Sequence, residues 1–534
     1  MGSSTYEKVS VGGIRGWMTK ELFDLLPPLF FENPLSFVGK TGGEVVKASR
    51  IRSAAILGLS NGRRIFLKRD LTKGRFASVK YLFLPSKGRK EWFIAFKMHR
   101  MGLPIPKPLG WLERTRRGIV RESFYLAEAV GSGETLDKTP TPPVPEVAKT
   151  VRKIHHAGLF HKDLHAGNFI WEGQTLFLID LHSAEILRTL SLSQRLRNLS
   201  LLFHSLRSVW AEKEQSLFMD IYFEGEKRSP AKKEEILQKI HHHMGRLQKR
   251  QWRSRTRRCL KESTEFSIQT RNGFRYYHRR DFGLDRARRI VEGHLRLLRE
   301  NPSQLIKNAP EVCLSIIKDE EGRVCVKHFR NLTSWRTLKD YFRRPKGLKS
   351  WVGSHGLGVR GIPSLTPFAL VEKRKWGGVR ESFFLMETSE TGREMDRYIL
   401  ERLGNVQQKR RFTKAFAEWL SRLHRKRIFH RDMKTCNILV LEGGGGWAFL
   451  LLDQEDISFD EKVGSRQLFK SLLQLNTSTP KTVTRTDRLR CLKEYLRGNP
   501  ILNDPDVFIR TLMKESRRRG LVYVSPRGVV EESF

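Results

Sequence analysis

Cysteine is scarce in this sequence, which has five among 534 residues. The five are widely scattered, and no two have the close spacing of a zinc site or a redox motif. An odd, sparse set of cysteines is typical of a protein in a reducing cytosol.

Long hydrophobic runs are also missing. The first residues contain no charged segment followed by an apolar run, so we expect no signal peptide, and Tyr6 stands where a myristoylation motif requires Ser or Thr. The most apolar early stretch, LFDLLPPLFF at 22–31, is too short to span a bilayer and contains two prolines. We expect it to pack as an N-terminal arm.

Acidic residues are few relative to basic ones: 57 Asp and Glu face 100 Lys and Arg, giving a formal net charge of +43. Such a protein attracts polyanions, which include nucleic acid, an anionic membrane surface and a phosphorylated glycolipid. Charge alone does not choose among them. With 39% hydrophobic residues, including 32 Phe and 11 Trp, the chain can still bury the cores of two to four domains.

The two halves of the chain repeat each other. VRESFYLAE at 120–128 returns as VRESFFLME at 379–387, and KGRKEW at 87–92 returns as KGLKSW at 346–351. Two further pairs of segments match in the same order with similar gaps, which indicates a duplicated domain. Each half begins with a hairpin, a helix and two more strands and then becomes helical. This order predicts an α+β fold in which each copy has a strand-rich N-lobe and a helical C-lobe.

We accordingly divide the chain into five parts. They are an N-terminal arm (1–40), a first domain (41–245), a basic connecting segment with a hairpin and a helix (246–305), a second domain (306–520) and a C-terminal tail (521–534). Basic residues outnumber acidic ones about three to one over 227–300. This stretch is either a solvated connection or a docking face for a polyanion.

Each half contains one H-x-D-x-x-x-x-N segment, HKDLHAGN at 161–168 and HRDMKTCN at 430–437. Phosphoryl transfer requires a carboxylate that accepts the proton of the attacking hydroxyl, with an oxygen ligand for Mg²⁺ close behind it. Asp163 and Asn168 suit these two roles in the first half, and Asp432 and Asn437 suit them in the second.

A second carboxylate follows each segment at the end of an apolar strand. Asp180 ends TLFLID and Asp453 ends WAFLLLD, and each is placed to hold the metal that bridges nucleotide phosphates. His161 and His430 are predicted to support the loops rather than to act on substrate. The three consecutive histidines 241–243 point in different directions around a helix, so a solvated helix end is favoured there over a metal site.

A strand lysine precedes the helix in each half, Lys68 in the first and Lys327 in the second. In kinases such a lysine contacts the α- and β-phosphates and is held by a glutamate of the next helix. Glu91 suits this role in the first half. The matching position in the second half is Ser350, so the partner of Lys327 is either missing or comes from elsewhere. A glycine-rich phosphate loop is not recognisable in either half.

Together, these segments resemble the bacterial lipopolysaccharide core kinases, which phosphorylate Kdo (3-deoxy-manno-octulosonic acid) or heptose and have a protein-kinase-like fold. The motifs that carry the resemblance are the strand lysine, GLPIPKP, VRESFYLAE, and HKDLHAGNFIW followed by LIDL. It covers about 45–245 and 310–500, as two tandem copies.

The resemblance implies ATP and Mg²⁺ as cosubstrate and metal, and a sugar hydroxyl of the lipopolysaccharide inner core as acceptor. It also implies work at the cytoplasmic face of the bacterial inner membrane, where the charge of the chain suits an anionic leaflet. Charge still leaves nucleic acid open as a partner.

Two other functions stay open on the sequence. One is a kinase of the same fold that acts on protein or on another small molecule. The other is a nonenzymatic pair of pseudokinase domains that binds polyanions. Whether the second domain is active also stays open.

Overall fold

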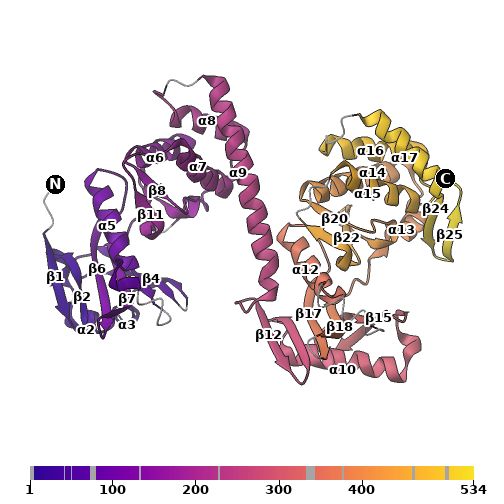
Figure 1. Cartoon of the computed structure of the whole chain (residues 1–534), viewed down its shortest axis with the longest axis horizontal. Helices are drawn as coiled ribbons and strands as arrows, with labels where there is room; N and C mark the ends of the chain where they lie inside the picture. Colours follow the sequence, from indigo (N-terminus) through magenta and orange to yellow (C-terminus); the bar gives the residue numbers. More distant parts are fainter. Residues whose placement is uncertain are drawn as a thin grey trace. The chain divides into compact units, whose positions relative to one another are not determined.

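The computed structural model describes residues 5–40, 42–49, 51–72, 80–131, 134–226, 229–331, 343–375, 378–459, 464–499 and 504–534. The chain forms two compact units, Met1–Gln248 and Lys249–Phe534. Each unit combines a strand-rich lobe with a helical lobe, as Figure 1 shows. The predicted fold of two tandem kinase-like domains is confirmed.

A sheet of seven described strands forms the N-lobe of unit 1. In spatial order its strands are β1 (Tyr6–Val11), β2 (Ile14–Thr19), β6 (Pro108–Arg116), β7 (Ile119–Glu128), β5 (Arg64–Leu71), β4 (Arg52–Gly58) and β3 (Glu44–Ala48). All neighbouring strands are antiparallel. The turn at Asn61-Gly62 joins β4 to β5, as the sequence predicts, and Lys68 pairs with Tyr125 of the central strand β7.

The N-lobe of unit 2 repeats this topology. Its seven described strands follow the order β12 (Phe266–Arg271), β13 (Phe274–Arg279), β17 (Pro367–Lys375), β18 (Gly378–Glu387), β16 (Gly322–Arg330), β15 (Val312–Asp319) and β14 (Lys307–Asn308). Lys327 on β16 pairs with Phe384 of β18, which is the register of Lys68 and Tyr125 in unit 1.

Three segments that the sequence analysis set apart from the two domains are integral parts of the units. The predicted arm at 1–40 contributes the β1–β2 hairpin, whose second strand pairs with β6. The predicted connecting segment at 246–305 contributes the β12–β13 hairpin, which pairs with β17. In each case the hairpin completes a sheet edge by hydrogen bonding to a strand about 100 residues away, which local sequence patterns do not reveal.

The predicted C-terminal tail is also structured. Residues 521–534 contain the hairpin of β24 (Leu521–Ser525) and β25 (Gly528–Glu532). This hairpin packs on the helical lobe of unit 2, where the backbone N–H of Val524 donates to Asp396 Oδ2 at 2.9 Å.

Helices cover both faces of each sheet. In unit 1, α1 (Lys20–Leu25), α2 (Pro28–Glu32) and α3 (Pro34–Lys40) share a hydrophobic core with one face, and α5 (Lys87–Arg100) packs on β6 and β7. In unit 2 these places are taken by α10 (Leu284–Glu300) and α12 (Lys346–Val359). Because both faces are covered, the central strands carry nearly continuous apolar runs such as SFYLA and SFFLM.

The first residues of α5 and α12 explain why KGRKEW and KGLKSW share a glycine. A Cβ on Gly88 would lie 2.5 Å from the backbone oxygen of Phe124, and one on Gly347 would lie 2.4 Å from Ser382 Oγ. Glycine therefore lets each helix begin directly against the central strand. This close approach brings the residue one turn later, Glu91 in unit 1 and Ser350 in unit 2, toward the strand lysine.

The C-lobes are helical in both units. Unit 1 uses α6 (Val144–His156), α7 (Leu192–Leu206), α8 (Glu212–Tyr222) and the first part of α9 (Pro230–Thr256). Unit 2 uses α13 (Met395–Arg402), α14 (Val406–Arg425), α15 (Ser465–Ser478), α16 (Arg485–Gly498) and α17 (Pro505–Arg519). Within the described ranges no helix has both the length and the apolar character to cross a bilayer.

Candidate active sites

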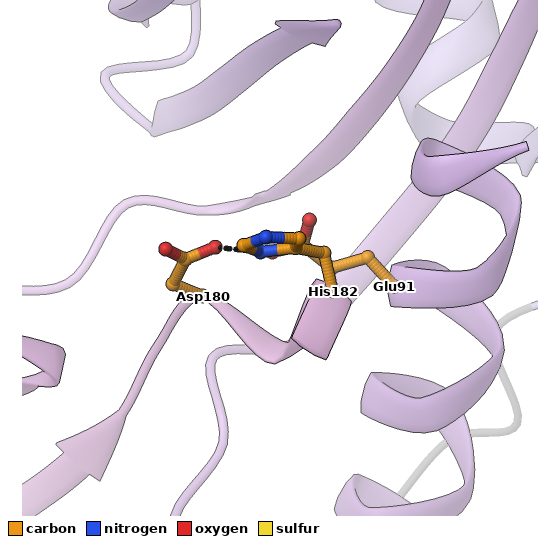
Figure 2. Close-up of side chains that lie close together, drawn as sticks. All are labelled: Glu91, Asp180 and His182. Atoms are coloured by element: carbon orange, nitrogen blue, oxygen red, sulfur yellow. Dashed lines mark hydrogen bonds and ion pairs between the residues drawn. The ribbon is translucent and has the colours of Figure 1, made fainter. Parts of the chain in front are cut away.

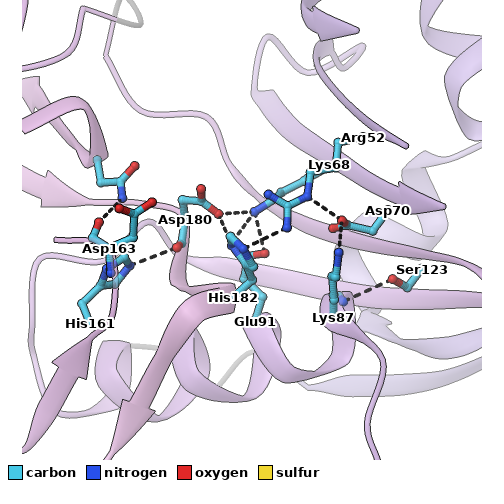
Figure 3. A network of polar contacts seen from close by, with 12 residues as sticks. Arg52, Lys68, Asp70, Lys87, Glu91, Ser123, His161, Asp163, Asp180 and His182 are labelled. Atoms are coloured by element: carbon cyan, nitrogen blue, oxygen red, sulfur yellow. Dashed lines mark hydrogen bonds and ion pairs between the residues drawn. The ribbon is translucent and has the colours of Figure 1, made fainter. Parts of the chain in front are cut away.

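In unit 1 the strand lysine lies between a buried and a partly exposed acidic side chain (Figure 3). Lys68 Nζ donates to both carboxylate oxygens of Glu91 on α5, at 3.0 and 2.8 Å, and it also donates to Asp180 Oδ1. Burial alone would lower the pKa of Lys68, but the charges of Glu91 and Asp180 raise it above its ordinary value. The structure thus brings together three of the predicted site residues and keeps the lysine charged.

Asp180 occupies a strained backbone position at the end of β10 (Thr175–Leu178), with a φ of 61°. This left-handed conformation aims Oδ1 at Lys68 and at His182, whose Nδ1 lies 2.5 Å away. Burial would raise the pKa of Asp180, but the hydrogen bond from His182 and the charge of Lys68 together hold it well below its usual range. Asp180 is therefore an ionised carboxylate.

A chain of polar contacts continues from His182 toward the sheet edge (Figure 3). Arg52 Nη2 donates to His182 Nε2 at 2.9 Å, so the proton of the ring is on Nδ1, which donates to Asp180. Arg52 Nε and Lys87 Nζ both donate to Asp70 Oδ1, at 2.8 and 3.1 Å. The sequence analysis missed His182, because only its contact with Asp180 distinguishes it from other histidines.

The HKDLHAGN loop of unit 1 is fixed by its histidine and asparagine. The backbone N–H of Asp163 donates to His161 Nδ1 at 3.2 Å, and His161 Nε2 donates to the Asp180 carbonyl oxygen at 3.1 Å. Asn168 Nδ2 donates to the Asp163 carbonyl oxygen at 2.8 Å. His161 therefore supports the loop, as predicted, while the Asp163 side chain stays 65% exposed.

Glu91, Asp180 and His182 offer three ligand atoms within 4.8 Å of one another, as a metal site does, and Figure 2 shows them facing one another. The ammonium of Lys68 already lies between the two carboxylates, and both nitrogens of His182 have partners. A metal ion at this point would have to displace a charged lysine. The group therefore serves to hold Lys68 and Asp180.

Asn168 and Asp180 fit the Mg²⁺ site that the sequence predicts. The asparagine uses its amide nitrogen within the loop, which leaves its amide oxygen as a ligand. Lys68 and His182 both bond to Oδ1 of Asp180, which leaves Oδ2 as a second ligand. Hard carboxylate and amide oxygens are the ligands that Mg²⁺ prefers.

In unit 2, Lys327 is also held by two carboxylates, but one of them comes from a different structural element than in unit 1. Lys327 Nζ donates to Asp453 Oδ1 at 2.7 Å and to both oxygens of Glu455 at 2.8 and 2.9 Å. Ser350, which takes the place of Glu91, donates its Oγ proton to Glu455 Oε2 at 3.0 Å. Of the two alternatives that the sequence left open, the partner of Lys327 comes from elsewhere.

The HRDMKTCN loop of unit 2 is also held by its asparagine and histidine, but the histidine bonds to the residue before the aspartate rather than to the aspartate itself. Asn437 Nδ2 donates to the Asp432 carbonyl oxygen at 2.8 Å, and His430 Nε2 donates to the Leu452 carbonyl oxygen at 3.0 Å. His430 therefore has the predicted supporting role. Asp453 has a φ of 49°, which repeats the conformation of Asp180.

The side chain of Asp432 is more restrained than that of Asp163. Asn437 Nδ2, Gln474 Nε2 and Lys434 Nζ approach its carboxylate at 3.3, 3.2 and 3.1 Å. The Asp163 carboxylate has a longer contact, 3.7 Å to His165 Nε2. Lys434 and His165 occupy the same place, two residues after the aspartate, so each loop presents a basic side chain beside its carboxylate.

Comparisons with known proteins agree with the duplication. The sequence profile of the lipopolysaccharide kinase (Kdo/WaaP) family matches twice, at residues 58–222 and 322–495, which together make up more than half of the chain. None of the curated proteins matches. Among solved structures, "WaaP in complex with acyl carrier protein" has 20% sequence identity and a TM-score of 0.30, over 40% of this chain and 92% of the WaaP chain.

Proposed function

Because the chain belongs to the lipopolysaccharide kinase (Kdo/WaaP) family, we propose that it transfers the γ-phosphate of ATP to a sugar hydroxyl of the lipopolysaccharide inner core, on Kdo or on heptose. The observation that carries the proposal is the paired constellation. Each unit brings a strand lysine against the aspartate that follows an apolar strand and places an Asp–Asn loop beside them.

The residues of unit 1 would divide the reaction as follows. Lys68, oriented by Glu91, contacts the α- and β-phosphates. Asn168 and Asp180 hold Mg²⁺, which neutralises charge on the phosphate oxygens when bound. Asp163 accepts the proton of the sugar hydroxyl as its oxygen bonds to the γ-phosphorus and the bond from that phosphorus to the bridging oxygen of ADP breaks.

The exposure of Asp163 supports this role. A general base must reach a hydroxyl that arrives from solvent, and the fixed His161 and Asn168 contacts position the Asp163 backbone while its carboxylate faces outward. In unit 2, Lys327, Asp432, Asn437 and Asp453 would have the roles of Lys68, Asp163, Asn168 and Asp180.

We also propose that the protein works at the anionic cytoplasmic surface of the inner membrane. Two adjoining cavities of about 230 and 250 Å³ in unit 2 share Arg344 and Lys349. Their other basic lining residues are Arg253, Arg257, Arg330, Arg343, Lys346, Arg360 and Arg380. Glu311 is the acidic residue among the described residues that line them.

The corresponding part of unit 1 is less basic. By the alignment of KGRKEW with KGLKSW, Leu84 and Pro85 stand where unit 2 has Arg343 and Arg344. Lys87, the counterpart of Lys346, forms an ion pair with Asp70 at 3.1 Å, which is shorter than the 3.7 Å contact of Lys346 with Glu311. The cavities of unit 2 thus suit phosphate groups of an anionic leaflet or of the acceptor itself.

Transfer assays with single variants test the proposed reaction. Purified protein is incubated with labelled ATP, Mg²⁺ and inner-core oligosaccharide, alongside Asp163→Asn, Asp432→Asn and the double variant. We expect wild type to label a core sugar and each single variant to lose the share contributed by its own unit. A positioned base accounts for roughly 10²- to 10⁴-fold of the rate, so the double variant should be nearly inactive.

Two results would contradict the proposal. One is the lack of transfer by wild type to any core acceptor, and the other is full transfer by the double variant. Transfer to protein or to another small molecule in the same assay would identify a different acceptor on the same fold.

A further inference from the structure

The carboxylate that holds the strand lysine comes from different elements in the two units. In unit 1 it is Glu91 on α5, which is 1% exposed. In unit 2 it is Glu455 in the short turn η7 (Gln454–Asp456), directly after Asp453. Both glutamates accept from the lysine ammonium through both carboxylate oxygens, so the geometry at the lysine is the same.

The exchange is reciprocal at two positions. Where unit 1 has Glu91 on the helix, unit 2 has Ser350; where unit 2 has Glu455, two residues after the aspartate, unit 1 has His182. Each unit therefore has one glutamate at these two positions. The other position carries a hydrogen-bond donor to a carboxylate, since Ser350 donates to Glu455 and His182 donates to Asp180.

The backbone of unit 2 is adapted to this arrangement. Gly353 lies one turn after Ser350 on α12, and a Cβ there would be 2.4 Å from the backbone oxygen of Gln454. The matching position of unit 1 is Ile94, a buried core residue. Glycine thus lets the η7 turn approach α12, which places Glu455 within reach of both Ser350 and Lys327.

Burial makes this contact consequential. Lys327 is 7% exposed, and a buried ammonium is costly unless a carboxylate pairs with it. Had Ser350 simply replaced the glutamate without compensation, Asp453 would have to hold the lysine alone while also serving as a metal ligand. Glu455 instead shares the lysine with Asp453 and contacts it through both carboxylate oxygens.

We propose that Glu455 is the positioning residue of a second nucleoside triphosphate site, in which it orients Lys327 toward the α- and β-phosphates. The inference rests on the proposed function, because it assigns the same roles to Lys327 and Asp453. The glutamate and the aspartate that contact Lys327 share one turn in unit 2. In unit 1 the same pairing depends on α5.

Titration calorimetry of the full chain with the ATP analogue AMP-PNP and Mg²⁺ tests this inference. We expect wild type to bind two nucleotides per chain. Glu455→Gln should weaken one of the two sites by roughly 10- to 100-fold, the range for loss of a charge-assisted hydrogen bond. Glu91→Gln is the matched variant and should weaken the other site, and the double variant should weaken both.

A rescue experiment separates orientation of the lysine from general packing. Glu455→His places the residue of unit 1 in the turn and should weaken the second site. Ser350→Glu added to Glu455→His reproduces the arrangement of unit 1 and should restore most of the affinity. Thermal melting of each variant identifies any that fail to fold, and Glu455→Asp, which keeps the charge, should retain more affinity than Glu455→Gln.

Binding of one nucleotide per wild-type chain, unchanged by Glu455→Gln, would overturn the inference. So would a folded rescue variant that stays as weak as Glu455→His alone. Two-site binding that depends on Glu455, in a protein that transfers no phosphate to core sugars, would support the inference while contradicting the proposed acceptor. Transfer to a core sugar by unit 1, with no nucleotide bound in unit 2, would support the proposed acceptor and contradict the inference.

Discussion

Asp180 and Asp453 combine a strained backbone conformation with a contact to the strand lysine. Both have a positive φ, 61° and 49°, which is uncommon for residues other than glycine, although Asp and Asn tolerate it better than most. The conformation turns each carboxylate toward its strand lysine. Such strain persists only where surrounding contacts hold it. Its repetition in both units therefore indicates that the contacts around each aspartate, rather than the turn by itself, maintain this conformation.

Asp180→Asn should separate the charge of this residue from its backbone conformation. Asparagine accepts a positive φ and keeps the volume, but it removes the negative charge that would hold Mg²⁺. The variant is measured on the Asp432→Asn background, in which unit 1 alone would transfer phosphate. We expect the rate of transfer to fall by roughly 100-fold or more and the Mg²⁺ concentration that the reaction requires to rise.

Asp220→Asn, a surface substitution on α8 that also removes one charge, serves as the control for this prediction and should change neither quantity. Unaltered transfer and Mg²⁺ dependence in Asp180→Asn would remove Asp180 from the metal site.

Corresponding helices of the two units share a buried histidine. His155 near the end of α6 accepts from the Tyr222 hydroxyl at 2.6 Å, and His424 near the end of α14 contacts the Tyr495 hydroxyl at 2.7 Å. Burial lowers the pKa of His155 to about 3 and that of His424 to about 4. These neutral histidines tie the helix before each catalytic loop to a helix further along the chain.

The two histidines predict a loss of stability in mild acid. Each folded-state pKa lies below the ordinary value of 6.5, so the unfolded chain binds protons first. Stability is intact above pH 6.5 and falls as the pH drops toward 4, by roughly 2 kcal/mol for each histidine between pH 7 and 5. Urea unfolding of the full chain at both pH values measures this change.

The comparison variant is His155→Phe with His424→Phe. It should be less stable than wild type at pH 7, because each tyrosine hydroxyl loses its contact with a histidine, yet it should lose less stability on acidification. An equal loss in the variant and in wild type would show that other groups cause the acid sensitivity.

At the scale of the whole molecule, duplication has kept the fold while changing the surface. The two sheets have the same strand order, and each uses a hairpin from outside the matched family segments to complete its edge. The net charge of +43 is not spread alike over the repeats, since the basic cavities of unit 2 have no equally basic counterpart at the aligned positions of unit 1. The proposed membrane contact therefore belongs to unit 2.

Removing two charges from these cavities should weaken membrane binding. Arg343→Ser with Arg344→Ser should reduce affinity for vesicles of phosphatidylglycerol and phosphatidylcholine by about tenfold or more, because each basic residue near an anionic surface contributes about 1 kcal/mol. Flotation at two salt concentrations measures the change, and the difference from wild type should shrink at high salt.

Arg517→Ser with Arg519→Ser removes the same charge from exposed positions at the end of α17 and should have a smaller effect. Equal losses in the two variants would mean that net charge, rather than these cavities, attracts the membrane.

The sequence by itself determined the duplication, the α+β class and the positions of the two H-x-D-x-x-x-x-N loops. These follow from short segments such as HKDLHAGN and HRDMKTCN, in which the functional side chains are a few residues apart and their spacing is visible in the chain. Strand and helix patterns are equally local, because each depends on neighbouring residues.

Only the tertiary structure decided which hairpins complete the sheets and which carboxylate holds Lys327. Glu455 is 128 residues from Lys327, and in sequence it is one acid among the three in DQED. Its contact depends on how closely the η7 turn approaches α12, which Gly353 allows. A pairing between distant segments is set by packing, so the serine in KGLKSW marks a missing partner but does not show what replaced it.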